Sequence, residues 1–195
     1  FGFQKFVGFK SGNVDYQSHR NRYGDMDWWD GLEMKDMSGY TTTLLTTLSE
    51  DYIKENKDKP FCLYIAHAAP HSPMQGPDEK AVRTEATPEG DKNSDRSNKE
   101  IYKDMVEELD WSVGRILETL KKYKLDENTF VVFFSDNGPV INNGGSAGGY
   151  KGAKGSPWEG GHRVPGICYM PGTIKEGTTC EQTVMSFDLF PTMLD

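Results

Sequence analysis

Apolar residues recur at helical spacing in two segments of the chain. Between residues 40 and 56 the apolar positions are Leu44, Leu45, Leu48, Tyr52 and Ile53. Between residues 101 and 120 they are Ile101, Met105, Leu109, Val113, Ile116, Leu117 and Leu120. Steps of three and four place such residues on one face of a helix, so the pattern predicts two amphipathic helices. The polar sequence KENKDK closes the first helix, and lysines crowd the end of the second, where they suit the helix dipole.

Three short apolar runs predict buried strands. They span residues 61–66, 130–134 and 166–170. Each run is continuous rather than alternating, which is the pattern of a strand covered on both faces. Helices and strands that alternate along the chain favour an α/β fold with a largely parallel mixed sheet and helices on both faces. In such folds, ligands bind outside the carboxyl ends of the strands.

The remaining segments predict loops. Residues 1–39 combine aromatics, Gly and Asp with weak periodicity, which predicts long loops with short strands. Residues 75–98 form a polar, exposed stretch with Pro, Gly and Ser. Trp28 and Trp29 lie among polar residues in the first segment. For this pair, packing beneath a loop is favoured over stacking on a sugar ring.

Composition and charge narrow the function classes. The chain has 195 residues, enough for one domain or two, and a formal net charge of −8. Without a dense Lys and Arg stripe, the electrostatic footprint of a nucleic-acid-binding protein is missing. An anionic substrate would need a local basic cluster or a bound cation to offset the overall charge. No apolar run approaches the roughly 20 residues of a membrane span.

The cysteines and the chain ends give weaker signals. Cys62, Cys168 and Cys180 contain no CxxC pair, so no zinc framework is visible and the redox compartment stays open. The chain starts in an aromatic-rich segment and stops inside an apolar pattern. We therefore expect the domain to be truncated at both ends.

The strand predicted at residues 130–134 runs directly into Ser135, Asp136, Asn137 and Gly138. Asp-Asn-Gly is a turn signal, because Asn and Gly tolerate positive φ. Asp136 and Asn137 also carry hard oxygen donors of the kind that calcium binds. Two adjacent ligands are too few for a metal site, so a plain turn and part of a metal site both remain open.

Two histidines follow the run at residues 61–66. His67 and His71 are four apart, but Pro70 and Pro73 argue against a helix that would pair them on zinc. A histidine placed by prolines beside a cleft is a candidate general acid, and an ordinary hydrogen-bonded loop histidine is the alternative.

Two lysines lie in a later glycine-rich loop. Lys151 and Lys154 occur in YKGAKGSPWEGG, whose glycines do not match the GxxxxGK[ST] spacing of a phosphate-binding loop. For each of them a solvated surface lysine is the alternative.

Taken together, these segments resemble the sulfatase family, within the alkaline-phosphatase-like superfamily. The order is a strand with PHSP, a long helix, a strand with SDNGP, a glycine loop with KG, EGG and HRVPG, another strand, and SFDLFPT. The most specific pieces are FFSDNGP and KGSPWEGGHRVP. The resemblance covers nearly the whole chain. It implies an alkaline-phosphatase-like fold, with residues 1–195 forming part of a single catalytic domain.

The resemblance also implies roles by position. In sulfatases the Asp and Asn of SDNG are calcium ligands, and these correspond to Asp136 and Asn137. Lys154, rather than Lys151, would bind the sulfate and steady the leaving oxygen. His71 would lie beside the sulfate and lend a proton to that oxygen. Gly138 would let the chain turn away after the metal ligands.

Some elements of the family do not occur in these 195 residues. Among them are Cys-x-Pro-Ser-Arg and Ser-x-Pro-Ser-Arg, the sources of the formylglycine nucleophile, and the early acidic pair of the calcium site. We expect them upstream of Phe1, with a C-terminal subdomain also missing, and we expect the chain alone to be inactive. A natural pseudoenzyme is the alternative.

The implied function is calcium-dependent hydrolysis of an aryl or carbohydrate sulfate monoester. The implied partners are a sulfated small molecule or glycan and the formylglycine-generating enzyme, and the implied location is periplasmic, secreted or lysosomal. Two other functions stay open. One is phosphoryl transfer by a Ser or Thr nucleophile with transition metals, and the other is non-catalytic binding of sulfated glycans.

Overall fold

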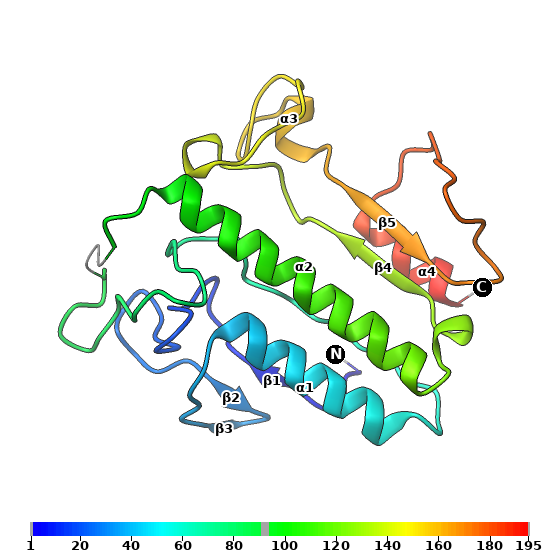
Figure 1. Cartoon of the computed structure of the whole chain (residues 1–195), viewed down its shortest axis with the longest axis horizontal. Coiled ribbons are helices and arrows are strands. Elements are labelled where there is room, and N and C mark those ends of the chain that lie inside the picture. The colour runs from blue at the N-terminus through cyan, green and yellow to red at the C-terminus, as the bar shows by residue number, and fades with distance from the viewer. Residues whose placement is uncertain (1, 91–93, 195) are drawn as a thin grey trace.

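The computed structural model describes residues 2–90 and 94–194. Its helices are α1 (Thr41–Asn56), α2 (Asn98–Lys122), α3 (Glu159–His162) and α4 (Leu189–Leu194). Its short 3-10 turns are η1 (Asp126–Asn128), η2 (Ile141–Asn143) and η3 (Ser186–Asp188). Its strands are β1 (Val7–Gly8), β2 (Trp29–Asp30), β3 (Glu33–Met34), β4 (Val131–Phe134) and β5 (Gly166–Tyr169). Helices and strands are thus interleaved, as in an α/β protein (Figure 1).

The two predicted amphipathic helices are confirmed as α1 and α2. α2 begins three residues before its first apolar position, because a capping box closes its start. The Ser97 side chain accepts from the Glu100 amide, and the Glu100 carboxylate accepts from the Ser97 amide over 2.8 Å. This arrangement satisfies two of the amides that a helix start leaves unpaired.

α1 and α2 lie side by side and run in the same direction (Figure 1). The hydroxyl of Thr46 donates to that of Ser112 over 2.6 Å, deep in the interface. One to two turns further along both helices, Thr119 donates to the carboxylate of Glu50 over 3.1 Å. Contacts that advance together along both helices establish the parallel packing, and the small hydroxyl side chains let the helices approach closely.

The core lies between the start of α2 and the loops that precede α1 and follow residue 67. Its buried members are Tyr16, Tyr40, Ala69, Ile101 and Met105. The Tyr16 and Tyr40 rings stack with centroids 5.4 Å apart. Their hydroxyls reach past the core, to the carbonyls of His71 at 3.0 Å and Gln75 at 2.8 Å. The core therefore holds the backbone on both sides of the PHSP segment.

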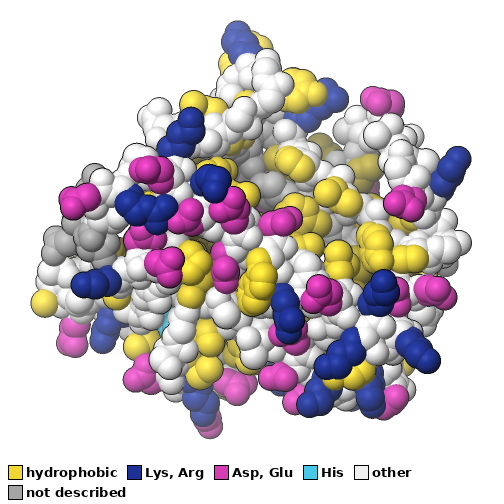
Figure 2. Space-filling view, in the orientation of Figure 1, with side chains coloured by type: hydrophobic (Ala, Val, Ile, Leu, Met, Phe, Trp, Pro, Cys, Tyr) yellow, Lys and Arg dark blue, Asp and Glu magenta, His cyan; other side chains and the backbone are white. Residues whose placement is uncertain are grey.

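Every strand pairing among the described residues is antiparallel. β1, β2 and β3 form one small sheet, and β4 pairs with β5 from Val131 opposite Tyr169 to Phe134 opposite Gly166. The strands predicted at residues 130–134 and 166–170 are confirmed as β4 and β5. Their predicted burial is wrong, since all four residues of β5 are exposed. Hydrophobic side chains gather over this pair in Figure 2. The largely parallel sheet stays a prediction.

The strand predicted at residues 61–66 is absent. This segment passes behind α2 as an extended chain in Figure 1, with no ladder to any described strand. Its residues alternate between half-buried and exposed, and Phe61 packs edge-on against Tyr52 with ring centroids 6.0 Å apart. A strand is defined by paired backbone groups, and an apolar run alone does not supply a partner.

The loop predictions hold with one correction. Trp28 is fully buried against the His19 ring, at 4.7 Å between centroids, which confirms packing beneath a loop for this tryptophan. Residues 75–90 and 94–97 form no helix or strand, as predicted. They are not exposed throughout, because Gln75 and Arg83 are buried. No helix in the described part of the chain has the length and apolar content needed to cross a membrane.

Candidate functional site

The turn after β4 presents two oxygen donors at the end of the strand. Ser135 closes the turn, because its hydroxyl donates to the carbonyl of Asn137 over 2.9 Å. Asp136 is exposed and Asn137 is half-buried. Within the described residues, no hydrogen bond or ion pair occupies the side-chain oxygens of either one. A carboxylate and an amide left open in this way have the donor chemistry that suits a hard cation.

Gly138 is required by close packing rather than by an unusual backbone angle. Its amide donates to the carbonyl of Gly161 over 2.9 Å. A Cβ on Gly138 would lie 2.0 Å from the carbonyl oxygen of Gly160, a separation that no side chain tolerates. Its φ is not among the positive values in the described chain, so the expected role in turning the chain is corrected to one in close approach to α3.

The two lysines of the glycine loop lie in different surroundings. The Lys151 ammonium lies over the Trp158 ring, 3.7 Å from its centroid. Lys154 is exposed, and no acidic side chain of the described residues pairs with it. The Lys154 amide donates to the carbonyl of Pro139 over 3.0 Å, which fastens this loop to the SDNGP turn. The main chain of Lys154 is thus fixed beside the Asp136 turn, and its side chain has no ion-pair partner among the described residues, whereas the Lys151 ammonium contacts Trp158.

The His71 ring is in contact with Ser72 through Nδ1. This nitrogen lies 2.9 Å from the Ser72 carbonyl oxygen, to which it donates when protonated, and 3.3 Å from the Ser72 hydroxyl, which donates to it when it is not. Nε2 is left as the outward-facing nitrogen of an exposed ring. The backbone is fixed on both sides, because its amide donates to Ala68 over 2.8 Å and its carbonyl accepts from Tyr16. His71 lies between two cis prolyl bonds, Ala69–Pro70 and Ser72–Pro73.

His67 does not share a site with His71. Burial lowers its pKa from the ordinary value of 6.5 to about 4, so the ring is neutral near pH 7. Its Nε2 lies 3.3 Å from the Ser112 hydroxyl, and its buried Nδ1 has no partner. The described residues contain no group of three or more His, Cys, Asp or Glu placed to hold a metal.

The four residues singled out by the sequence fall into two groups. Asp136, Asn137 and Lys154 lie on two loops joined by main-chain hydrogen bonds. His71 is joined instead to the core, through Tyr16, and forms no hydrogen bond to either loop in the described structure. Asp136 and Asn137 offer two oxygen donors of the kind that calcium binds. Because two are too few for a metal site, a complete site needs further ligands.

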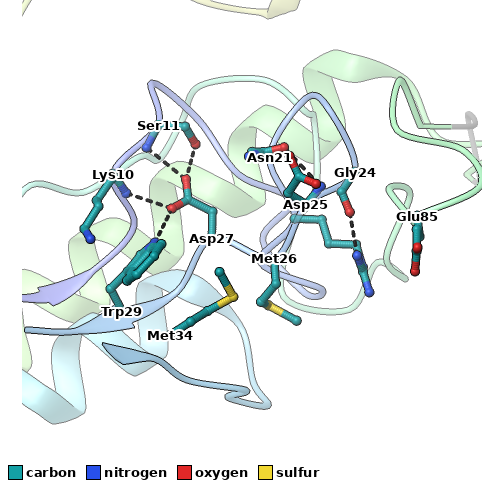
Figure 3. A pocket seen from close by; sticks show the side chains of 11 residues that line it. Lys10, Ser11, Asn21, Gly24, Asp25, Met26, Asp27, Trp29, Met34 and Glu85 are labelled. Atoms are coloured by element: carbon teal, nitrogen blue, oxygen red, sulfur yellow. Dashed lines mark hydrogen bonds between the residues drawn. The ribbon is translucent and has the colours of Figure 1, made fainter. Parts of the chain in front are cut away.

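Sequence reasoning missed two buried carboxylates that shape the first loop. Asp27 accepts from the amides of Lys10 and Ser11, the Ser11 hydroxyl and the Trp29 indole (Figure 3). Burial alone would raise the pKa of Asp27, but these hydrogen bonds, led by Ser11, lower it. The Lys10 ammonium covers the Trp29 ring at 3.3 Å, so one face of that indole is already occupied.

Asp15 is the second missed carboxylate. It accepts from the amides of Val82 and Arg83 at 2.7 and 2.8 Å and from the side chain of Gln75. Its pKa is lowered too, because hydrogen bonds from backbone amides outweigh burial. Asp15 lies between Val14 and Tyr16, and this apolar flanking was the one signal of its burial in the sequence. Both carboxylates are satisfied internally and act as structural anchors.

Two hollows open on this part of the molecule. A shallow one of about 690 Å³ lies over the Asp27 network and includes Trp29, Met26 and Met34 (Figure 3). A smaller one of about 320 Å³ lies between the SDNGP turn and the glycine loop, and Lys154 forms part of its wall. The smaller hollow is the one that adjoins the joined loops.

The comparisons with known proteins identify the family of the chain. The sulfatase family model matches residues 1–195. The chain belongs to the sulfatase family. The rat protein named steryl-sulfatase is 36% identical over 160 residues, covering 78% of this chain and 26% of the relative. Human arylsulfatase D is 33% identical over 162 residues, covering 79% of this chain and 25% of the relative.

A solved structure extends the likeness to the fold. The structure of Ps i-CgsB in complex with k-i-k-neocarrahexaose superposes with a TM-score of 0.82 at 29% identity. The match covers 98% of this chain and 45% of that one. This sulfatase chain thus spans about a quarter of the length of the curated relatives named here.

Proposed function

We propose that the protein containing this chain hydrolyses sulfate monoesters with calcium as cofactor. The observation that carries the proposal is the joining of the Asp136–Asn137 turn to Lys154 through the Pro139 carbonyl. The main chains that bear two oxygen donors and a cation, none of them paired among the described residues, are thus fastened together in a sulfatase-family chain. Groups of both kinds are needed to hold a hard cation and a sulfate together, and further metal ligands would come from elsewhere.

Asp136 and Asn137 would contribute two ligands to the calcium ion. When bound, the ion supplies positive charge that stabilises the negative charge spreading over the sulfate oxygens. Lys154 would donate to a sulfate oxygen and to the leaving oxygen, and its charge is not spent on any described acidic group. A fixed cation aimed at developing charge is the most effective form of such stabilisation.

His71 would act as the general acid. For this role the ring would start as the imidazolium, protonated on both nitrogens. As the sulfur–oxygen bond breaks, Nε2–H would give its proton to the leaving oxygen, which departs as an alcohol or phenol, and the ring would be left neutral with its remaining proton on Nδ1. The Ser72 carbonyl would accept a hydrogen bond from Nδ1–H and keep the ring oriented. General acid catalysis contributes roughly 10²–10⁴ in rate.

The nucleophile is proposed to be a formylglycine residue outside residues 1–195, installed by a formylglycine-generating enzyme. The chain would then be one part of a single catalytic domain, with a largely parallel sheet completed by other segments and a C-terminal subdomain. The substrate class is an aryl or carbohydrate sulfate, and the carbohydrate option is supported by the oligosaccharide named with Ps i-CgsB. A periplasmic, secreted or lysosomal location completes the proposal.

The test compares sulfate and phosphate esters with full-length protein. Hydrolysis of 4-nitrophenyl sulfate and of 4-nitrophenyl phosphate is measured after treatment with a chelator, then with calcium, zinc or manganese restored. Sulfate hydrolysis recovered by calcium supports the proposal. Phosphate hydrolysis recovered by zinc or manganese would instead assign a phosphoryl-transfer function. Saturable binding of a sulfated glycan with no turnover of either ester would assign a binding function.

A further inference from the structure

The side chain of Tyr16 reaches from the core to the loop that carries His71. Tyr16 is fully buried, and its ring stacks on the ring of Tyr40. Its hydroxyl donates to the His71 carbonyl over 3.0 Å. Burial raises the pKa of this phenol well above its ordinary value of 10, so the hydroxyl keeps the proton that it donates. A neutral donor therefore holds the His71 backbone from the interior of the protein.

The main-chain end of Tyr16 is fixed as well as its hydroxyl end. Its amide donates to the side-chain oxygen of Gln75 over 3.0 Å. Its carbonyl accepts from the amide of Thr41 at 2.8 Å and from the Thr41 hydroxyl at 3.1 Å. Gln75 and Thr41 are both fully buried, so neither can turn away without leaving a polar group unpaired in the interior. The start of α1 and the loop after His71 thus hold Tyr16 in one place.

The two bonds from Tyr16 to residues 71 and 75 close a ring. The main chain from His71 to Gln75 forms one side of this ring, and the Tyr16 residue, from its amide to its hydroxyl, forms the other. The Gln75 side chain is fixed in turn, because its nitrogen donates to the Lys80 carbonyl at 2.9 Å and to the Asp15 carboxylate at 3.2 Å. A rigid aromatic residue therefore braces the short loop that begins at the candidate general acid.

The position of the His71 ring depends on this loop. The ring is exposed, and its hydrogen-bond partners in the described structure both belong to the next residue, Ser72. The ring consequently moves with its own backbone. A general acid has to come within about 3 Å of the atom that takes its proton. A displacement of about 1 Å at such a group can lower the rate by roughly 10²-fold.

We propose that Tyr16 is a positioning residue for His71, and that it keeps the general acid within reach of the leaving oxygen by bracing the loop from residue 71 to residue 75. The inference rests on the proposed function, because it requires His71 to act as the general acid. It deepens that function by adding a residue that touches neither the substrate nor a reacting atom. Tyr16 acts on the reaction through His71 alone.

The experiment compares Tyr16→Phe with Tyr40→Phe in the full-length protein. Each variant removes one hydroxyl from the same stacked pair and keeps the ring, but the Tyr40 hydroxyl bonds to the Gln75 carbonyl, four residues from His71. Tyr16→Phe should lower kcat and kcat/KM together, about 10-fold for phenyl sulfate and much less for 4-nitrophenyl sulfate, whose leaving group needs little help from an acid. Tyr40→Phe should lower kcat/KM for the two esters by equal factors or not at all. Urea unfolding midpoints measure how much stability each variant has lost.

A double-mutant cycle tests whether Tyr16 acts through His71. His71→Ala removes the imidazole but keeps the carbonyl to which Tyr16 donates, so the structural bond remains. In this background Tyr16→Phe should change kcat/KM for phenyl sulfate by about two-fold at most, because no general acid is left to position. A further loss of about 10-fold in the double variant would overturn the inference, since independent effects multiply.

The outcomes separate this inference from the proposed function. Equal selectivity changes in Tyr16→Phe and Tyr40→Phe, or none in Tyr16→Phe, would overturn the inference and leave the proposed role of His71 standing. Equal losses for both esters in His71→Ala would remove the general acid, and the inference with it, without removing sulfatase activity. A loss confined to the poor leaving group in Tyr16→Phe, absent from Tyr40→Phe and from the His71→Ala background, supports both.

Discussion

The main-chain amide of Lys154 donates to the carbonyl of Pro139 across 3.0 Å. Pro139 follows Asn137 by two residues, so this bond fixes the position of the Lys154 backbone relative to the two candidate metal ligands. The bond from Gly138 to Gly161 ties the same turn to α3 as well. The main chains that bear the lysine and the two oxygen donors are thereby held together.

Lys154→Ala in the full-length protein is expected to raise the inhibition constant for inorganic sulfate. A charge-assisted hydrogen bond contributes roughly 1.5–3 kcal/mol, which corresponds to about a 10- to 100-fold change. Lys151→Ala is the matched control, because its ammonium is engaged with Trp158. Equal changes in the two variants would contradict the assignment of Lys154 over Lys151.

Asp136→Ala and Asn137→Ala are expected to reduce bound calcium, because each removes an oxygen ligand. Metal content after dialysis against calcium, measured by mass spectrometry, gives a readout that does not depend on turnover. Asp51→Ala, which removes an exposed carboxylate from α1, should leave the calcium content unchanged. Calcium retained at the wild-type level in both site variants would rule out these ligands.

His71→Ala is expected to lower turnover most for esters of weakly acidic alcohols. A good leaving group needs little help from an acid, whereas a poor one loses the full factor of about 10²–10⁴. The measurement is the slope of log kcat/KM against leaving-group acidity for a series of aryl sulfates. A steeper slope in the variant supports the general acid, and a parallel downward shift would remove that role.

Stability is expected to fall on mild acidification because of His67. The folded pKa is about 4 and the ordinary value is 6.5, so the unfolded chain binds the proton more readily between these two values. Full protonation of the unfolded state would cost the fold about 3 kcal/mol, lost as the pH falls from 6.5 to 4. Urea unfolding at several pH values should show this slope in wild type and His162→Gln, and a flatter one in His67→Gln.

Gly138→Ala is expected to destabilise the protein by roughly 1–3 kcal/mol, the usual cost of overpacking a rigid site. The added methyl group would meet the Gly160 backbone, which has no flexible side chain to move aside. Gly114→Ala on the exposed face of α2, with nothing within 4 Å of the new Cβ, should instead stabilise by about 0.5–1 kcal/mol. Chemical unfolding midpoints of the two variants should therefore move in opposite directions.

Local patterns in the sequence predicted those helices and strands whose own residues show a clear apolar pattern. The apolar stripes predicted α1 and α2, and the run at residues 130–134 predicted β4. What they could not supply was pairing. The run at residues 61–66 has a strand composition but no ladder, because hydrogen-bond partners are a property of the neighbouring chain. The antiparallel partnership of β4 with β5 is likewise invisible in either segment alone.

In the candidate site too, the sequence predicted which residues matter but not the contacts that join them. Motif order singled out Asp136, Asn137, Lys154 and His71. The backbone bonds around the first three depend on glycines whose Cα atoms pack against neighbouring carbonyl groups, and in the sequence those glycines indicate only turns. The distinction between the lysines is implied by family position alone and stays a prediction, and the structure adds that the Lys151 ammonium contacts Trp158.

The hydroxyl of Tyr16 connects the innermost aromatic side chain of the core to the main chain of His71. The position of the His71 imidazole therefore depends on the packing of the core as well as on the loop that contains the histidine. A substitution that loosens the packing around Tyr16, Tyr40 or Met105 would impair the role proposed for His71 before it unfolded the protein. Loss of core packing would then cause both effects: a small loss would displace the His71 imidazole, and a larger loss would unfold the protein.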